Sequence, residues 1–509
     1  MPRSTAPLSP SSSELPLYRQ LAQVYEQAIA GGSLRPGMQM PSVRELRQRH
    51  QVSLSTALQV LRWLEAQGAV EVRERVGYFV SAPRTLAAVP AAREPDMQRP
   101  LQPDPQLFAG INERISVILE KARLAGPLVV DLGSAMPDPS LFDGTALNKL
   151  AVRLLKEQPD VLVYGPSAPR THPEFQQAMA HHALRFGLNL APAEVSATHG
   201  NSEAVNLALD AVAQPGDVVA VESPTFFGIL QAIEAQGLRA LEIPSSPHTG
   251  ISLEALELAV RNEPRLKAVV VVPHLQMPLG SVMPDAHKER LVQLCAAHGL
   301  ALIEDDIYRE FMDTLQPARP AKAWDQPGDK GCVIYCVSLS KSFAPGLRQG
   351  WMSGGRWHAR LQMLKFSRTR NMQSWSQLLA ARSVDSPAYE RHMRRMRAQL
   401  QVQREQAAQA VARYFPVSSR FSLPRGGLSL WVELPPAIST MALYDEALAR
   451  GVRIAPGPMF SNTGRYENFI RLSCGLPFTS AVEQAYQTLG ALMHEQLRAA
   501  GPGLALVRA

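Results

Sequence analysis

The segment Val337–Trp351, VSLSKSFAPGLRQGW, holds one lysine among small hydroxyl residues and one arginine seven residues later. A lysine attacks carbonyl groups only as the neutral amine, which requires a lowered pKa, whereas an arginine keeps its charge and suits a bound phosphate. Lys341 and Arg348 together therefore suit a phosphorylated aldehyde.

A second pattern, LALIEDDIYREF, places acids directly after an apolar run that is typical of a buried strand. Asp305 is then expected at the strand end, with Tyr308 three positions later. A carboxylate there can hold a pyridine nitrogen protonated, and a phenol can donate to a ring hydroxyl. These two residue types suit a ring that acts as an electron sink.

Two further segments extend this set. In ATHGNSEAVNLAL a strand ends at Gly200 and a helix starts through Asn201 and Ser202, which offers free backbone N–H groups to a phosphate. Phe226, in ESPTFFG, can stack on the ring. Each pattern alone also fits a structural role, such as a solvated lysine, a helix cap or a turn, but their joint order favours a site.

The elements that must position these residues alternate along the chain. From Leu128 onward, short β-branched runs are separated by amphipathic helical patterns, which indicates an α/β layer architecture with ligands at the carboxyl ends of parallel strands. The runs are VSATHG, GDVVAVESP, KAVVVVPH, LALIEDD and CVIYCVSL. Beyond Arg391 a long polar helix is expected to lead to a smaller α+β lobe with FSLPRGGLSLWVELP, VRIAP and FIRLSCG.

This order of motifs resembles the fold-type I aminotransferases from about Leu128 to the end of the chain. The resemblance implies that Lys341 forms the aldimine with pyridoxal 5'-phosphate, that Asp305 pairs with the pyridine nitrogen and that Tyr308 pairs with the 3'-oxygen. It also implies an arginine for a substrate carboxylate, Arg471 in IRLSCG, for which a bidentate fork is well suited. The remaining implied cofactor contacts are the stacking Phe226, the phosphate ligands Asn201, Ser202, Ser338 and Arg348, and Tyr164, which reaches the phosphate of the partner subunit.

The amino-terminal segment has a different periodicity. Apolar residues recur at helical spacing from Leu17 to Ile29, including Leu21, Val24 and Tyr25, and Gly31 ends the pattern. Ser42, followed three residues later by Glu45, is a capping box that opens a second helix.

A third helix is expected from around Ser53–Ser55 to Gly68, with one apolar face made of Ala57, Leu58, Leu61 and Leu64. The following AVEVRERVGYFV has two β-rich runs around a charged tip, which indicates a hairpin. Three helices and a hairpin predict a winged helix-turn-helix.

In such a domain the third helix enters the major groove of DNA. Ser53, Ser55 and Thr56 are expected to meet phosphates or bases at its start. Arg44 from the second helix, and Arg73 or Arg75 from the hairpin, are expected to reach the DNA backbone. An interaction module with another type of partner has the same periodicity, so the pattern alone leaves both alternatives open.

The amino-acid sequence of this segment resembles that of the GntR family of bacterial regulators. PLYRQ, LRPGMQMPSVREL, VSLSTALQVLRWLEAQG and GYFV follow the family order over roughly seventy residues, although Leu54 stands where arginine is frequent. A GntR domain joined to an aminotransferase-like domain is the arrangement of the MocR subfamily of transcriptional regulators. That resemblance implies a head-to-tail homodimer that binds an operator and senses an amino compound or the cofactor itself.

The resemblance sets three domain bounds: a winged helix-turn-helix over residues 14–83, an extended linker over 84–110 that is rich in Pro and Ala, and an aminotransferase-like domain over 111–509.

The family places an asparagine before the Pro-x-Gly turn of PHLQMPLGSVMP, where this chain has Met277. A thioether cannot donate the lost hydrogen bond, which is worth only ~1 kcal/mol. We therefore expect cofactor binding to persist and turnover to be reduced. Thr171 and Gln176 also replace the Gly and Arg of aminotransferases.

The bulk properties limit the function classes. A chain of 509 residues with 19% charged and 46% apolar residues is typical of a globular protein with two or three folding units. Its net charge of +7 permits a nucleic-acid partner. The four cysteines form no CxxC pair, no His cluster has metal-site spacing, and no apolar run reaches the ~18 residues of a membrane span, so we expect a cytoplasmic protein without a metal. Two classes stay open: a DNA-binding regulator with a pyridoxal sensor, and an active aminotransferase, of the aminoadipate or aromatic type, with an accessory domain.

Overall fold

The computed structural model describes residues 16–66, 69–73, 76–81, 89–98, 110–163, 171–314 and 318–500. Tyr164, Arg75 and the predicted domain boundary near Pro83 lie outside these residues. The chain divides into two units. The first unit holds the described residues up to Val89, Ala408–Val417 and the described residues from Glu483, and the second unit holds those of Pro90–Ala407 and Ser418–Val482.

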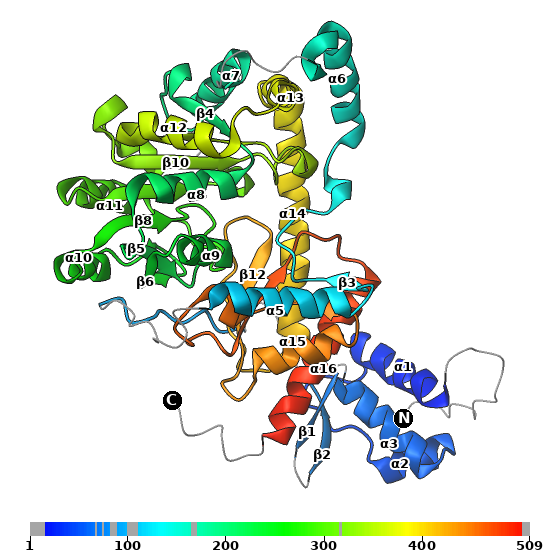
Figure 1. The fold of residues 1–509 in the computed structure, drawn as a ribbon. Coiled ribbons are helices and arrows are strands. Elements are labelled where there is room, and N and C mark those ends of the chain that lie inside the picture. Colours follow the sequence, from blue (N-terminus) through cyan, green and yellow to red (C-terminus); the bar gives the residue numbers. More distant parts are fainter. Residues whose placement is uncertain are drawn as a thin grey trace. The chain divides into compact units, whose positions relative to one another are not determined.

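The first unit contains the three helices and the hairpin expected from the sequence (Figure 1). Their bounds are α1 Leu17–Ala30, α2 Val43–His50, α3 Leu54–Ala66, β1 Val70–Arg73 and β2 Gly77–Val80. The strands β1 and β2 are antiparallel, with Val70 opposite Val80 and Arg73 opposite Gly77. The winged helix-turn-helix prediction is therefore confirmed.

Side-chain caps define where α2 and α3 begin. The Glu45 backbone N–H donates to Ser42 Oγ at 3.2 Å, and the Ser42 N–H donates to Glu45 Oε2 at 2.7 Å, which is the predicted capping box. The Thr56 N–H donates to Ser53 Oγ at 3.1 Å at the start of α3. Each such cap contributes ~1 kcal/mol to a helix.

The apolar face of α1 is narrower than the sequence pattern. Leu21 and Tyr25 are buried, whereas Leu17 and Val24 are 44% and 46% exposed. The buried stripe runs through Leu21, Ala22 and Tyr25. Because an α-helix turns by 100° per residue, Leu17 and Val24 lie to one side of this stripe.

The second unit is built on an eight-stranded sheet with the order β4-β11-β10-β9-β8-β5-β6-β7. Neighbouring strands among β10, β9, β8, β5 and β6 are parallel, whereas β11 is antiparallel to both β10 and β4. The bounds are β4 Val195–Thr198, β5 Val218–Ser223, β6 Arg239–Ser246, β7 Gly250–Ile251, β8 Leu266–Val271, β9 Ala301–Asp305, β10 Val333–Ser338 and β11 Gly350–Ser353.

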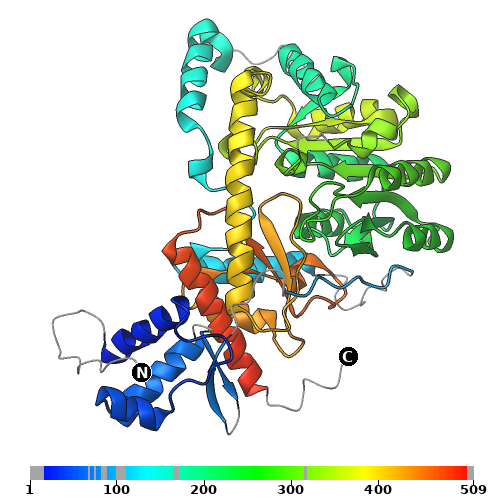
Figure 2. The same ribbon diagram turned by 180° about the vertical axis from the view of Figure 1, so that it is seen from behind.

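Helices precede, connect and follow the strands of this sheet along the chain. Their bounds are α5 Ile111–Leu124, α6 Gly144–Glu157, α7 Pro173–Leu184, α8 Asn201–Val212, α9 Phe227–Ala235, α10 Leu253–Asn262, α11 Asp285–Ala297, α12 His358–Thr369 and α13 Ser374–Val384. The long polar helix of the sequence analysis is α14, Pro387–Tyr414, which is one continuous helix (Figure 2). No helix among the described residues is long and apolar enough to cross a membrane.

A smaller α+β lobe follows, as expected. Its three-stranded sheet has the order β12-β15-β14, with β12 Ser429–Glu433, β14 Ala455–Pro456 and β15 Phe469–Ser473. A separate pair joins β13 Val452–Arg453 to β3 Val130–Asp131 in parallel. Helix α15, Thr440–Leu448, belongs to this part of the chain, whereas α16, Ser480–Ala499, belongs to the first unit from Glu483 onward.

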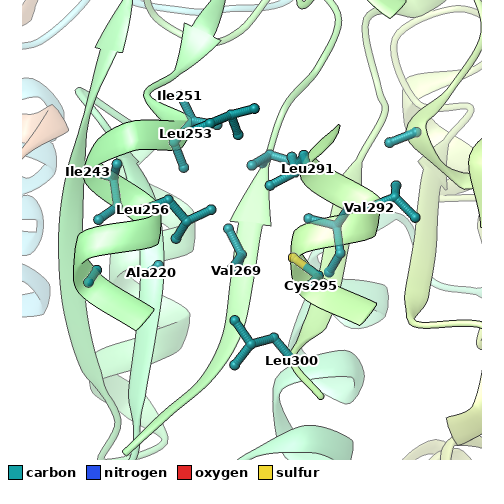
Figure 3. Close-up of a cluster of buried hydrophobic side chains, with 14 of the residues drawn as sticks. Ala220, Ile243, Ile251, Leu253, Leu256, Val269, Leu291, Val292, Cys295 and Leu300 are labelled. Carbon is teal, nitrogen blue, oxygen red and sulfur yellow. The ribbon is translucent and has the colours of Figure 1, made fainter. Parts of the chain in front are cut away.

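Packing of helices on the large sheet fixes its strands. One apolar cluster joins strand residues such as Ala220 and Val269 to Leu256 of α10 and Leu291 of α11, all fully buried (Figure 3). Helix α8 contacts β4, β8, β9, β10 and β11. The carboxyl ends of the parallel strands are thereby held at one edge of the sheet, and Phe226, Asp305, Ser338 and Lys341 lie at or shortly after those ends.

Candidate cofactor site

Lys341 follows the carboxyl end of β10 and is part-buried. Its Nζ donates to the Tyr308 hydroxyl at 2.7 Å and to the backbone carbonyl of Ala135 at 2.6 Å. The amine is therefore fixed between the turn after β9 and a segment that precedes α6.

Burial lowers the pKa of Lys341 to about 7, and the positive charges of Arg471 and Arg348 act in the same direction. The Asp305 carboxylate opposes this shift. Because a neutral amine is the nucleophile toward an aldehyde, the site keeps an appreciable fraction of reactive Lys341 near neutral pH.

Asp305 is the last residue of β9 and is 3% exposed. The Asn201 side-chain amide donates to Asp305 Oδ1 at 2.7 Å. Burial raises the pKa of Asp305 to about 7, and the neighbouring Asp306 carboxylate raises it further, whereas Lys341 and Asn201 lower it. A cation placed beside Asp305, such as a protonated ring nitrogen, would restore its charge and bind to it.

Two glycines shape the turn that begins α8. Gly200 has φ +76°, and a Cβ there would lie 3.0 Å from the Arg348 guanidinium. A Cβ on Gly350 would lie 2.6 Å from the Val337 carbonyl and 2.9 Å from Gly200 Cα. Only glycine permits this close approach, which brings the Arg348 cation to the N-terminal end of α8. A helix N-terminus and a guanidinium together suit a phosphate.

Three other predicted residues lie at the end of β10 and at the starts of α8 and α9. Ser338 ends β10, and its Oγ accepts from the Ser340 N–H at 3.1 Å. Ser202 lies in the first turn of α8. Phe226 precedes α9, and its ring centroid lies 4.6 Å from that of Phe227.

Arg471 lies on β15 of the smaller lobe and is 3% exposed. One of its terminal nitrogens donates to the Gly133 carbonyl, and its Nε has no partner. Burial lowers the pKa of Arg471 to about 10, so the guanidinium stays charged at neutral pH. A charged group with an unused donor suits a ligand carboxylate.

The site contains several buried polar atoms without a hydrogen-bond partner in the described part of the chain. They are Thr198 Oγ1, Asn201 Oδ1, Ser340 Oγ and Arg471 Nε. Each unmade hydrogen bond costs ~1–3 kcal/mol, so a polar ligand that reaches these atoms gains affinity. The reactive amine, the buried carboxylate, the phenol and the Arg348 cation fit pyridoxal 5'-phosphate.

The residues that depart from the aminotransferase pattern have defined contacts. Met277 is 4% exposed, and the Ser429 hydroxyl lies 3.6 Å from its sulfur. The Thr171 hydroxyl accepts from the Ala197 N–H at 2.9 Å, and Gln176 donates to the Val195 carbonyl at 2.9 Å. Thr171 and Gln176 therefore support strand β4.

Sequence reasoning missed the two backbone carbonyls, of Ala135 and Gly133, that hold Lys341 and Arg471. Every residue carries a carbonyl oxygen, so residue type gives no signal for such an acceptor.

The predicted DNA contacts of the first unit are surface residues. Arg44, Ser53 and Ser55 are exposed, and Thr56 is half-buried. Ser53 Oγ lies 2.8 Å from both Ser55 Oγ and Thr56 Oγ1. Arg73 is paired with Glu71 at 2.8 Å and lies over the Phe79 ring at 4.3 Å.

Comparison with known proteins agrees with both units. The family of bacterial regulatory proteins named gntR matches residues 17–80, and the family named aminotransferase class I and II matches residues 135–487. The uncharacterized HTH-type transcriptional regulators YdcR and YjiR of Escherichia coli (strain K12) are 35% and 33% identical to this chain, and each match covers 94% of this chain and 99% of the relative. The chain belongs to the MocR subfamily of GntR regulators.

A solved structure supports the fold of the second unit in this MocR chain. The crystal structure of LysN, the alpha-aminoadipate aminotransferase of Thermus thermophilus, is similar with a TM-score of 0.67 and 26% identity. The match covers 77% of this chain and 99% of LysN. The fold-type I prediction is therefore confirmed. LysN was solved in complex with N-(5'-phosphopyridoxyl)-L-leucine.

Proposed function

We propose that this chain is a DNA-binding transcriptional regulator whose aminotransferase-like domain binds pyridoxal 5'-phosphate at Lys341 and senses an amino compound there. The carrying observation is the Lys341 amine, with a pKa lowered to about 7 and a 2.7 Å hydrogen bond to Tyr308, in a chain whose first unit is a winged helix-turn-helix. The gntR family match and the phosphopyridoxyl group of the LysN structure support the two halves of this proposal.

When bound, the cofactor supplies an aldehyde that exchanges one amine for another and a ring that withdraws electrons. Lys341 would attach it, Asp305 would hold a proton at the ring nitrogen, and Tyr308 would donate to the ring oxygen. Phe226 would stack on the ring and exclude water from one face. The phosphate would be bound by Asn201, Ser202, Ser338 and Arg348.

The side-chain amide of Asn201 has a second contact besides its proposed contact with the phosphate. Because it donates to Asp305 at 2.7 Å, it also keeps that carboxylate oriented. Its unpartnered oxygen remains available to a donor.

The effector is proposed to be a small amino compound that carries a carboxylate. Its amine would displace Lys341, and its carboxylate would bind Arg471, whose guanidinium is charged and has an unused N–H. A ligand shifts a regulator only by its differential affinity for two arrangements of the protein, and couplings of ~1–3 kcal/mol are typical.

The proposed domain bounds are 14–83 for the DNA-binding domain, 84–110 for the linker and 111–509 for the sensor. Ser53, Ser55 and Thr56 would contact DNA at the start of α3, and Arg44, Arg73 and Arg75 would contact its backbone. Regulation of an operator requires the compartment that holds the DNA, which is the cytoplasm in bacteria.

A head-to-tail homodimer is also proposed, because two DNA-binding domains fit an operator with two half-sites. Tyr164 would then reach the phosphate in the partner subunit. The molar mass from light scattering should be twice the 55.7 kDa of the chain; a mass of one chain at micromolar concentration would refute the dimer.

A second candidate function is an active aminotransferase. The set of Lys341, Asp305, Tyr308 and Arg471 favours it, because a reactive amine, a ring-nitrogen carboxylate and a carboxylate-binding arginine are what transamination needs. The buried Met277, which cannot donate a hydrogen bond, favours the sensor.

Genome-wide binding with and without pyridoxal 5'-phosphate, paired with a transamination assay, tests both candidates. We expect defined operator sites whose occupancy depends on the cofactor, and slow transamination. A kcat in the ordinary enzyme range of ~1–10³ per second, without specific DNA sites, would contradict the proposed regulator. It would support the active aminotransferase instead.

A further inference from the structure

Next to Asp305 lies a network of buried ionisable side chains. Asp306 is 3% exposed and accepts hydrogen bonds on both oxygens. His274 Nδ1 lies 2.8 Å from Oδ1, while Arg309 Nε and the Tyr335 hydroxyl donate to Oδ2 at 2.6 Å and 2.7 Å. Arg309 also donates to the Tyr335 hydroxyl at 2.7 Å. The carboxylate is thus held by three different elements.

A buried lysine sets the proton position on His274. Lys288 Nζ lies 3.0 Å from His274 Nε2 and donates to the Arg319 carbonyl at 2.6 Å. An ammonium donates and cannot accept, so Nε2 is the acceptor and the single ring proton is on Nδ1. His274 therefore donates to Asp306 as a neutral ring, and burial lowers its pKa accordingly.

Members of this network directly adjoin the proposed cofactor residues in the chain. Asp306 follows Asp305, and Arg309 follows Tyr308. His274 lies in the loop after β8, three residues before Met277. A shift of the network would therefore displace the carboxylate and the phenol.

We propose that His274 is a positioning residue that, through Asp306, fixes Asp305 and Tyr308 against the ring of the cofactor. This proposal rests on the proposed cofactor site. In this proposal His274 would act without touching the cofactor or an effector, because its ring is completely buried. Its role is to keep the Asp306 charge dispersed and the turn after β9 in place.

The charge of Asp306 acts on Asp305 through space. An ionised Asp306 raises the pKa of Asp305, and its donors weaken that effect by sharing the charge. Without the His274 donor, the pKa of Asp305 would rise further, so the proton shared with the ring nitrogen would move toward Asp305 and leave the ring less protonated. The other ionisable groups that face this pair are Glu222 of β5, Glu304 of β9, Lys288 of α11, Arg309 and Lys341.

The test compares His274→Phe with His274→Gln in the full chain loaded with pyridoxal 5'-phosphate. Phenylalanine removes both hydrogen bonds, whereas the glutamine amide can donate to Asp306 and accept from Lys288. The readouts are the pH titration of the visible absorbance of the bound cofactor and its dissociation constant. A ring nitrogen that is less protonated leaves the cofactor more electron-rich. The midpoint of the pH titration of its absorbance should therefore rise.

For His274→Phe we expect a midpoint about one pH unit higher and a dissociation constant about tenfold larger, as for the loss of one charge-assisted hydrogen bond. His274→Gln should stay within about twofold of the parent dissociation constant, which a purely structural role for the ring would not predict. A folded His274→Phe with the parent midpoint would overturn the proposal.

A milder variant decides the matter if His274→Phe does not fold. Tyr335→Phe removes one donor from Asp306 and should raise the midpoint by a smaller amount. The matched control is Tyr444→Phe, whose buried hydroxyl donates to the Ile118 carbonyl outside the network. Equal midpoints for both tyrosine variants would overturn the proposal. A parent protein without any cofactor absorbance would instead refute the proposed function.

Discussion

The two predicted sites of this chain differ in how much of their geometry exists before a ligand arrives. Arg44, Ser53 and Ser55 of the first unit are exposed, and the two serine hydroxyls lie 2.8 Å apart at the start of α3. In the second unit, by contrast, Asp305, Tyr308 and Arg471 are each 3% exposed. A surface that binds DNA must remain accessible to a long polymer, whereas a cofactor site can be enclosed and arranged before the ligand binds.

This difference has an electrostatic consequence. Enclosure moves the pKa of Lys341 down to about 7 and that of Asp305 up to about 7, because burial disfavours the charged form of each group. The exposed cations of the winged helix-turn-helix domain, such as Arg44, would instead act by displacing counterions from the DNA. Variants should therefore affect the two sites in different ways.

The largest expected effect is from Lys341→Ala, which separates the two sites completely. Without the amine no cofactor can be fixed to residue 341, so borohydride reduction followed by mass spectrometry should show complete loss of the covalent adduct. Binding to DNA should persist, because the winged helix-turn-helix has its own core, but its occupancy should no longer respond to the cofactor.

The matched control is Lys330→Ala, at an exposed lysine just before β10, which should keep the full adduct. An adduct of equal mass in the Lys341 variant would mean that another amine carries the cofactor. Loss of DNA binding in that variant would mean that the two units are not separable.

The sequence predicted five strands of the large sheet from their apolar runs. The runs that end at Thr198, Ser223, Val271, Asp305 and Ser338 are the strands β4, β5, β8, β9 and β10. Long apolar runs identify such strands because both of their faces are buried. The contact between Lys341 and Tyr308 follows once these strands share one edge.

Strands β6 and β11 were not predicted. The segment RALEIPSS of β6 mixes charged and apolar residues, and the strand lies next to the short β7 near the edge of the sheet. The four residues of β11 begin with a glycine and follow a proline-glycine turn, so their pattern is typical of a loop. Their strand conformation depends on antiparallel pairing with β4 and β10, which local sequence cannot show.

A second effect concerns pH and is confined to the enclosed site. Attachment of the cofactor needs the neutral Lys341 amine, and below a pKa of about 7 the neutral fraction falls by about tenfold per pH unit. The initial rate of cofactor uptake by the apoprotein should therefore rise by about 50-fold from pH 5 to pH 7 and level off above pH 8. Stopped-flow absorbance measures this rate. A rate that still rises tenfold per unit from pH 8 to pH 10 would indicate an ordinary, solvated lysine.

A smaller effect is expected in the winged helix-turn-helix domain. Arg44→Ala removes one exposed cation of α2, so binding should weaken on all DNA sequences, and the slope of log affinity against log salt should fall by about one. Fluorescence anisotropy at several salt concentrations measures both quantities. Arg261→Ala, at an exposed arginine of α10 in the second unit, is the control and should change neither. An unchanged slope for Arg44→Ala would remove this residue from the DNA surface.

The smallest effect is expected from Met277→Asn, which tests whether the enclosed site has been adapted for sensing. The new amide can donate one neutral hydrogen bond, worth ~1 kcal/mol, so cofactor affinity should rise by no more than about fivefold. Part of that gain is offset, because the amide is shorter than the thioether and leaves Ser429 without its sulfur contact at 3.6 Å. DNA affinity should not change. A shifted absorbance spectrum with faster transamination would identify Met277 as the residue that limits turnover; an unchanged spectrum and rate would show that another part of the site limits it.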